Sequence, residues 1–292
     1  MKRMPPAKAK YSKNSDSIVE RAQKLLMKAL LAHPGIALLP AKASWELINK
    51  HPILRKKAYA TTAAVSIAGM ACYLVGDMIF LTGSDDEKHP ILEHPQVPKH
   101  IFYLMVSREA LKTGGFMGAA GAPLLFAFVP HYSLAFEPAG KKFTTILSGV
   151  LATNIALSPI IHLGFTQFAL PLVEANQLLQ LGASHEDVDD LVATSQKRRK
   201  LVQYLYMLYA ILLAIASVMT IVAGLKGKSH YPRKWLPIVA NPILPTMALG
   251  SFVNAKFLPK KIRRKVQGCG LSGGSIIGMA LSGLTLYFGK KK

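Results

Sequence analysis

Charged residues are scarce in this sequence, and acidic residues are the scarcest of them. Only 17% of the 292 residues are charged, whereas about a quarter is usual for a soluble domain. The shortage is concentrated in long uncharged stretches, a composition that excludes a disordered chain and fits an ordinary soluble enzyme poorly. There are 15 Asp and Glu against 36 Lys and Arg, which gives a net charge of +21. On a chain this apolar, such an excess first indicates flanks held against anionic lipid.

Cysteine and the common catalytic motifs are also missing. The two cysteines, Cys72 and Cys269, lie far apart and form no C-x-x-C pair, so a disulfide scaffold is excluded and a metal or redox site has no support. The sequence contains no phosphate-binding loop, no H-E-x-x-H and no G-x-S-x-G. We therefore expect no cofactor and no metal. The basic runs lack interleaved aromatic residues, so we expect no binding of nucleic acid.

What the sequence has instead is long apolar runs. Six of them approach the roughly 20 residues that a helix needs to cross a bilayer. They are residues 58–82, 114–130, 143–173, 201–225, 235–258 and 269–288. No ten-residue alternating pattern of a membrane β-strand occurs. The sequence therefore predicts an all-α, polytopic membrane helix bundle of about six transmembrane helices, with the membrane domain over residues 57–292.

The third run is too long for one straight crossing. Its ~31 residues would extend roughly 46 Å, against an apolar layer of roughly 30 Å. The helix must therefore tilt, kink or protrude, and Pro159 could supply a kink.

Residues 1–56 form a separate basic extension. Within it, residues 16–32 have the pattern of an amphipathic helix, and Ser17 with Glu20 fits a capping box. We expect this helix to lie at the bilayer surface on anionic lipids. The alternative is a cap packed on the cytoplasmic side of the protein itself.

The distribution of basic residues predicts the orientation. Residues 1–57 contain 13 Lys and Arg, and the chain ends on three lysines. With an even number of spans both termini lie on one side, and the positive-inside rule places them in the cytoplasm, with the protein in the cell inner membrane. The basic loop 260–265 would then face outward. Either this loop is an exception or one span is wrong, and the short run 114–130 is the most doubtful.

Polar side chains inside the predicted spans are the candidate functional residues, because such groups are costly in lipid. Asn154, Ser158, His162 and Thr166 recur every four residues and share one helix face. His162 could relay a proton, with Asp77 or Glu174 as the orienting carboxylate. These three are the catalytic candidates. The alternative is that the polar groups only form hydrogen bonds between helices.

Further candidates lie in the later spans. Two prolines, Pro242 and Pro245, follow Asn241 and would leave backbone carbonyls without partners at membrane depth, as in helices that line ligand sites. The ligand-binding candidates are Asn154, Ser158, Thr166, Asn241, Asn254 and Tyr206. For the tyrosines of this span, Tyr206 among them, anchoring at the membrane interface is favoured over ligand contact.

Small residues repeat at intervals of four in the last span, at Gly270, Gly274 and Gly278. This pattern is typical of close helix contact, either within the chain or with a second copy or another membrane protein.

The order of several motifs resembles an uncharacterised bacterial membrane family, domain of unknown function family 6796. The resemblance rests on Gly76-Asp77-Met78, on His162, on the segment His230–Trp235 and on Asn241-Pro242. It covers residues 60–288, implies a six-span helical membrane protein and supplies no activity. From the residues themselves we expect an intramembrane polar pocket for a lipid or a small amphipathic ligand. A small transporter or a non-catalytic assembly partner in a membrane complex is the alternative, and whether the protein is an enzyme stays open.

Overall fold

A computed structural model of the chain describes residues 51–81, 89–241 and 270–289. All of them belong to one compact unit, Lys42–Lys292. Several sequence predictions fall outside the described residues: the amphipathic helix 16–32, residues 242–258 of the run 235–258, which include Asn254, and the basic loop 260–265.

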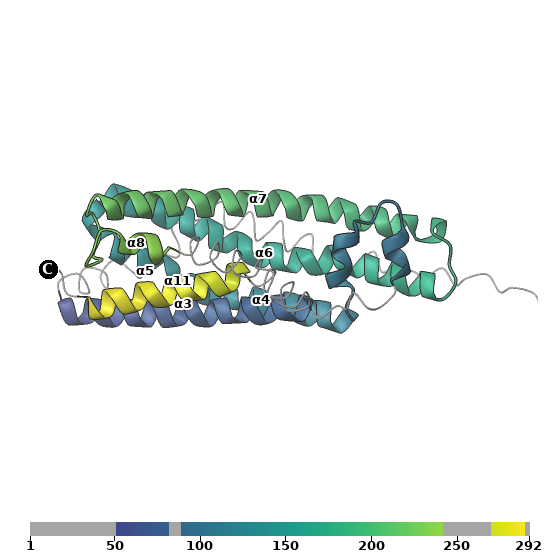
Figure 1. The fold of residues 1–292 in the computed structure, drawn as a ribbon, viewed down its shortest axis with the longest axis horizontal. Helices are drawn as coiled ribbons and strands as arrows, with labels where there is room; N and C mark the ends of the chain where they lie inside the picture. Colours follow the sequence, from purple (N-terminus) through teal and green to yellow (C-terminus); the bar gives the residue numbers. More distant parts are fainter. Residues whose placement is uncertain (1–50, 82–88, 242–269, 290–292) are drawn as a thin grey trace, which may run out of the picture. The chain divides into compact units, whose positions relative to one another are not determined.

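Every regular element in the described residues is a helix, which confirms the all-α prediction (Figure 1). The α-helices are α3 (Pro52–Phe80), α4 (Arg108–Leu125), α5 (Phe128–Ala135), α6 (Lys141–Gln180), α7 (Asp189–Leu225), α8 (Leu236–Val239) and α11 (Gly270–Phe288). Four short 3-10 helices join them: η2 (Pro90–Glu93), η3 (Lys99–Leu104), η4 (Glu137–Ala139) and η5 (Glu186–Val188).

Four helical stretches are long and apolar enough to cross a membrane: Pro52–Phe80, Arg108–Ala135, Lys141–Gln180 and Glu186–Leu225. They coincide with the first four predicted spans, including the doubtful run 114–130. The last predicted span is present as a shorter apolar helix, Ser272–Phe288. Of the fifth span, only α8 lies in the described part of the chain. The protein is therefore a helical membrane protein, with four of the six predicted spans found among the described residues.

Several helices extend beyond the apolar runs that predicted them. The run 114–130 was expected to stop at Pro130, but Pro130 is the third residue of α5, where no backbone N–H is needed. α6 continues through Pro159 and Pro171 as one helix of 40 residues, about 60 Å long. That is roughly twice the apolar thickness of a bilayer, so part of α6 protrudes.

The ends of these helices have local causes. Pro52 occupies the first turn of α3, and the Ser107 side chain accepts a hydrogen bond from the Ala110 N–H at the start of α4. α6 and α7 both end in the same glycine motif, with Gly182 at φ 92° and Gly227 at φ 71°. In each case the next residue donates its N–H five residues back, as in a Schellman cap.

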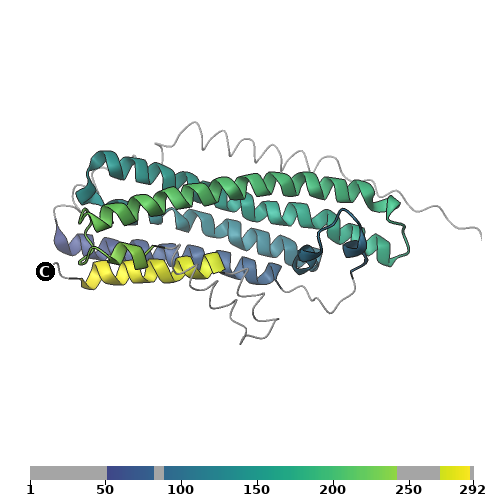
Figure 2. The same ribbon diagram turned by 45° about the horizontal axis from the view of Figure 1, so that its top comes forward.

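Neighbouring helices of the bundle run antiparallel (Figures 1 and 2). α3 lies beside α11, because Asp77 contacts Ser272 near one end and Ala63 meets Gly283 near the other. α4 packs between α3 and α6, and α6 forms a long hairpin with α7. Consequently the start of α3 and the end of α11 lie at the same end of the bundle.

We name the two ends by their residues. The terminal end comprises the start of α3, the turn 136–142, the turn 226–235 and the end of α11. There His230 contacts both Arg55 and Glu137, and Pro232 lies against Gly289. The hairpin end comprises residues 89–112 and 174–200. There His94 contacts Asp189 at 2.9 Å, and the Ile91 N–H donates to Asn176.

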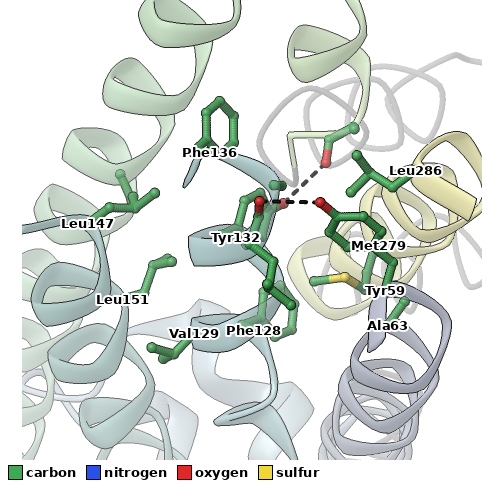
Figure 3. Packing of buried hydrophobic residues seen from close by; sticks show 14 of the residues in the cluster. Tyr59, Ala63, Phe128, Val129, Tyr132, Phe136, Leu147, Leu151, Met279 and Leu286 are labelled. Atoms are coloured by element: carbon green, nitrogen blue, oxygen red, sulfur yellow. Dashed lines mark hydrogen bonds between the residues drawn. The ribbon is translucent and has the colours of Figure 1, made fainter. Parts of the chain in front are cut away.

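The hydrophobic core of the terminal half surrounds α5 (Figure 3). Phe128 and Tyr132 of this short helix and Phe136, directly after it, stack in a row. Figure 3 shows them between Leu147 and Leu151 of α6 on one side and the side chains of α3 and α11 on the other. Two buried phenols of this core donate to backbone carbonyls: Tyr132 to that of Ala240 and Tyr59 to that of Leu134. This half of the bundle is thus tightly packed around α5.

Candidate functional site

The predicted polar face of α6 points inward. Asn154, Ser158, His162 and Thr166 are all buried. The two outer members hold helices together: Asn154 donates to the Tyr209 carbonyl of α7 at 2.7 Å, and Thr166 donates to the Leu111 carbonyl of α4 at 2.8 Å. Asn154 and Thr166 thus form hydrogen bonds between helices, as the alternative to a ligand site predicted. Ser158 and His162 lie between them on the same face of α6.

His162 lies where α3 and α4 cross at glycines. A β-carbon at Gly118 would come within 1.5 Å of the His162 ring, and one at Gly76 within 2.7 Å of its Nε2. The backbones are close enough that the same Gly76 position is 2.7 Å from the Gly114 carbonyl oxygen. The glycines of α4 therefore create the space that the imidazole fills. Tyr73 and Phe80 complete the surroundings, with ring centroids 5.0 and 5.1 Å from the imidazole.

Asp77 faces the opposite edge of the imidazole. Its Oδ1 is 3.9 Å from His162 Nδ1, which exceeds a hydrogen bond. Its Oδ2 accepts a 2.6 Å hydrogen bond from the Ser272 hydroxyl of α11. A gap of this width between two polar groups is one that a water molecule or a ligand atom bridges.

These residues line a cavity of about 200 Å³ to which five helices contribute. Its walls are Met70, Tyr73 and Asp77 of α3, Leu125 of α4, Ser158, Ile161, His162 and Phe165 of α6, Tyr206 and Tyr209 of α7, and Ser272 of α11. Four of the sequence candidates, Asp77, Ser158, His162 and Tyr206, are therefore brought together. We call this space the Asp77 cavity.

Two polar atoms of residues that line the Asp77 cavity are buried without a hydrogen-bond partner: His162 Nε2, which lies between Gly76 and Gly118, and the Tyr73 hydroxyl. Their residues are only 5% and 8% exposed. Leaving a buried polar group unsatisfied costs about 1–3 kcal/mol, so such atoms are rare in a folded core and often mark a site for water or a ligand.

A smaller cavity of about 40 Å³ adjoins the first and shares Met70, Leu125, Ser158 and Tyr209 with it. Asn154 and Asn241 line this second space, which is large enough for water. Asn241 donates to the Thr220 hydroxyl at 3.1 Å. Asn241 and His162 thus line adjoining cavities and not one shared cavity.

The remaining candidate, Glu174, lies elsewhere. It accepts a 3.2 Å ion-pair hydrogen bond from Arg108 at the hairpin end. Arg108 and Glu174 join α4 to α6 about two and a half helix turns beyond Phe165, the last α6 residue of the Asp77 cavity. Glu174 is therefore not placed to orient His162.

The Asp77 cavity lies just inside one edge of the apolar layer. On α7 the uncharged run begins after Lys200, and Tyr206 follows less than two turns later. Arg198 donates to the Gln167 carbonyl of α6, which places the same edge about one turn beyond His162. The cavity is thus close to the headgroup region on the hairpin side.

Two residues that line the cavity, Tyr73 and Ser272, are not among the candidates from the sequence. Met70, Tyr73 and Asp77 follow one another at intervals of three and four, which places them on one face of α3, so that spacing could have identified Tyr73. Ser272 had no comparable signal, since only the antiparallel packing of α11 on α3 brings it to Asp77. Gly274 and Gly278 of the same helix are buried within the chain.

Within the described ranges, no group of three His, Cys, Asp or Glu side chains could hold a metal ion. The chemistry that the described cavity offers is that of one carboxylate, one imidazole, hydroxyls and aromatic rings.

Comparisons with known proteins identify the family. No curated protein and no solved structure matches the chain. The model of DUF6796, a family of unknown function, matches residues 52–289, which include every described helix from α3 to α11. The chain therefore belongs to DUF6796, the family that its motifs resemble.

Proposed function

We propose that this protein binds the polar head of a small amphipathic molecule, such as a lipid, in the Asp77 cavity. The observation that carries the proposal is a space of about 200 Å³ between five helices, whose walls combine the Asp77 carboxyl group with hydroxyls and aromatic rings. Asp77 Oδ1, which lies 3.9 Å from His162 Nδ1, is the atom that a bound head group would reach, directly or through water.

The position of the cavity favours an amphipathic ligand over a fully polar one. Tyr206 is 45% exposed whereas Tyr73 is 8% exposed, so the cavity wall extends from the core to the outer surface of α7. That surface carries exposed apolar side chains, including Met207 and Leu208, which acyl chains would contact in a bilayer. A ligand could therefore keep its tail in lipid while its head enters between the helices.

Native mass spectrometry of the full chain released from its membrane tests the proposal. We expect the wild type to carry a bound amphipathic molecule and Ser158→Leu, which fills the cavity from α6, to lose it. Thr153→Leu is the matched control, because Thr153 is exposed on the same helix. If Ser158→Leu does not fold, Ile161→Phe fills the same cavity. Equal adducts on the wild type and on a folded, filled variant would overturn the proposal.

Transport is a second candidate, and the adjoining cavity is the observation that favours it. Polar wall residues continue along α7 from Tyr206 to Thr220, which is about 21 Å of helix. This is much of the roughly 30 Å apolar layer. If the two cavities form a route for protons, Thr220→Val should slow proton flux into proteoliposomes and leave binding in the Asp77 cavity unchanged. Equal flux for wild-type, Thr220→Val and protein-free vesicles would exclude this candidate.

We also propose that the terminal end faces the cytoplasm of the cell, across its inner membrane. Among the described residues this end carries one acid, Glu137, and nine basic residues: Arg55, Lys56, Lys57, Lys141, Lys142, Lys226, Lys228, Arg233 and Lys234. The hairpin end has seven of each sign. Its basic residues are Lys99, Arg108, Lys112, Lys197, Arg198, Arg199 and Lys200, and its acids are Glu93, Glu109, Glu174, Glu186, Asp187, Asp189 and Asp190. The positive-inside rule then places the Asp77 cavity near the outer leaflet.

A further inference from the structure

We infer that the head group bound in the Asp77 cavity is a cation, an amine or a quaternary ammonium. This inference rests on the proposed function and names its ligand class. It follows from the charge and the aromatic character of the cavity walls.

Asp77 is the one Asp, Glu, Lys or Arg among the eleven described residues that line the cavity. Its Oδ2 accepts from Ser272, whereas its Oδ1 has His162 Nδ1 3.9 Å away. A carboxylate held inside an apolar layer is unfavourable unless a positive charge or several hydrogen bonds compensate it. The wall therefore provides a carboxyl group that a further positive charge would stabilise in its ionised form.

His162 is a poor source of the missing positive charge. A protonated imidazole donates from both nitrogens, and the Nε2 proton would be buried between Gly76 and Gly118 without an acceptor. Two basic side chains of the hairpin end are engaged elsewhere: Arg108 pairs with Glu174, and Arg198 donates to the Gln167 carbonyl. Among the described wall residues there is no Lys or Arg, and we assign the positive charge beside Asp77 to the ligand.

Phe and Tyr rings make up four of the other ten residues that line the cavity. Tyr73, Phe165, Tyr206 and Tyr209 all line the cavity, and the rings of Tyr206 and Tyr209 are 6.1 Å apart. The faces of aromatic rings attract cations, and a cage of such rings is a common recognition site for quaternary ammonium groups. One carboxylate with several aromatic rings and no lining Lys or Arg selects a cation over an anion.

A competition between three chain-matched amphiphiles tests the charge of the head group. The full chain is mixed with dodecyltrimethylammonium, dodecanol and dodecanoate at equal concentrations, and native mass spectrometry reads the occupancy of each. We expect the cation to exceed dodecanol by about tenfold on the wild type. Asp77→Asn should reduce this ratio to within about twofold. Glu174→Gln, which removes a carboxylate outside the cavity, should keep the wild-type ratio.

A second variant covers the case in which Asp77→Asn does not fold. Tyr206→Leu changes a partly exposed ring of α7 and should lower the cation preference while dodecanol still binds. Equal occupancy by the three amphiphiles, or a preference for dodecanoate, would overturn the inference and leave amphiphile binding intact. If none of the three binds the wild type more than Ser158→Leu, the proposed function fails as well.

Discussion

The imidazole of His162 on α6 occupies the space that the absent side chain of Gly118 leaves on α4. A β-carbon at Gly118 would lie 1.5 Å from His162 Cδ2 and 2.0 Å from Nε2. Gly76 of α3 approaches the same nitrogen from the other side. The histidine and the two glycines therefore form one packing unit, which positions the ring beside Asp77.

The Gly118–His162 contact predicts a compensating pair of substitutions. Gly118→Ala should destabilise the protein by about 1–3 kcal/mol, because the new methyl group overlaps the ring. Adding His162→Ala should recover part of this loss, since the ring that clashes is gone. The midpoint of thermal unfolding in detergent measures both effects. Gly149→Ala is the control, because a β-carbon there would meet nothing within 4 Å. An unchanged midpoint for Gly118→Ala would show that the two helices are not this close.

A second buried histidine gives a prediction about stability alone. His131 of α5 contacts the Ser282 hydroxyl at 2.7 Å and the Thr62 hydroxyl at 2.9 Å, and Tyr231 also bonds to Ser282. Ser282→Ala leaves two buried groups without this partner and should lower the unfolding midpoint clearly, at about 1–3 kcal/mol for each group. Thr285→Ala on the same helix should have little effect, because Thr285 is only partly buried and its hydroxyl bonds to carbonyls of its own helix. Equal midpoints for the two variants would contradict the buried network.

A substitution at Thr166 should affect stability without affecting ligand binding. Its hydroxyl bonds to the Leu111 carbonyl and does not line the Asp77 cavity. Thr166→Val should therefore reduce the free energy of unfolding by about 1 kcal/mol while amphiphile occupancy stays at the wild-type level. Thr153→Val, at an exposed position of α6, should change neither quantity. A loss of occupancy in stable Thr166→Val protein would extend the binding site to this residue.

The sequence predicted the elements that depend on local pattern. Long apolar runs gave the first four spans, and the interval of four gave the buried face of α6. The interval of four did not distinguish Asn154 and Thr166, which form hydrogen bonds between helices, from His162, which lines the cavity. Their roles depend on the residues of α3, α4 and α7 that pack against each of them. The expected role of Glu174 was wrong for the same reason. Its position at the end of the span suggested a partner for His162, but it pairs with Arg108 of α4.

Contacts between distant segments also explain the role of the His230–Trp235 segment, which the sequence identified only by its resemblance to a family motif. In the segment His230–Trp235, His230 bonds to Glu137, Tyr231 reaches Ser282 and Pro232 lies against Gly289. These residues join the turn after α7 to α5 and α11. The motif thus serves the assembly of the terminal end, and no spacing within the segment indicates those partners.

The proposed orientation predicts which side of the membrane each end faces. Single cysteines introduced at Lys142 and Lys228 of the terminal end should react with a membrane-impermeant maleimide only after the cells are permeabilised. Cysteines at Glu186 and Asp190 of the hairpin end should react in intact cells. The buried Ser282 position, changed to cysteine, serves as the unreactive control. The reverse labelling pattern would place the terminal end outside and the Asp77 cavity near the inner leaflet.

A polar head group beside Asp77 should be visible in an experimental density map of the full chain in lipid nanodiscs. We expect elongated non-protein density whose head lies within contact distance of Asp77 and of the His162 ring and whose tail leaves past Tyr206. A cavity that is collapsed or holds only water would overturn the proposed function.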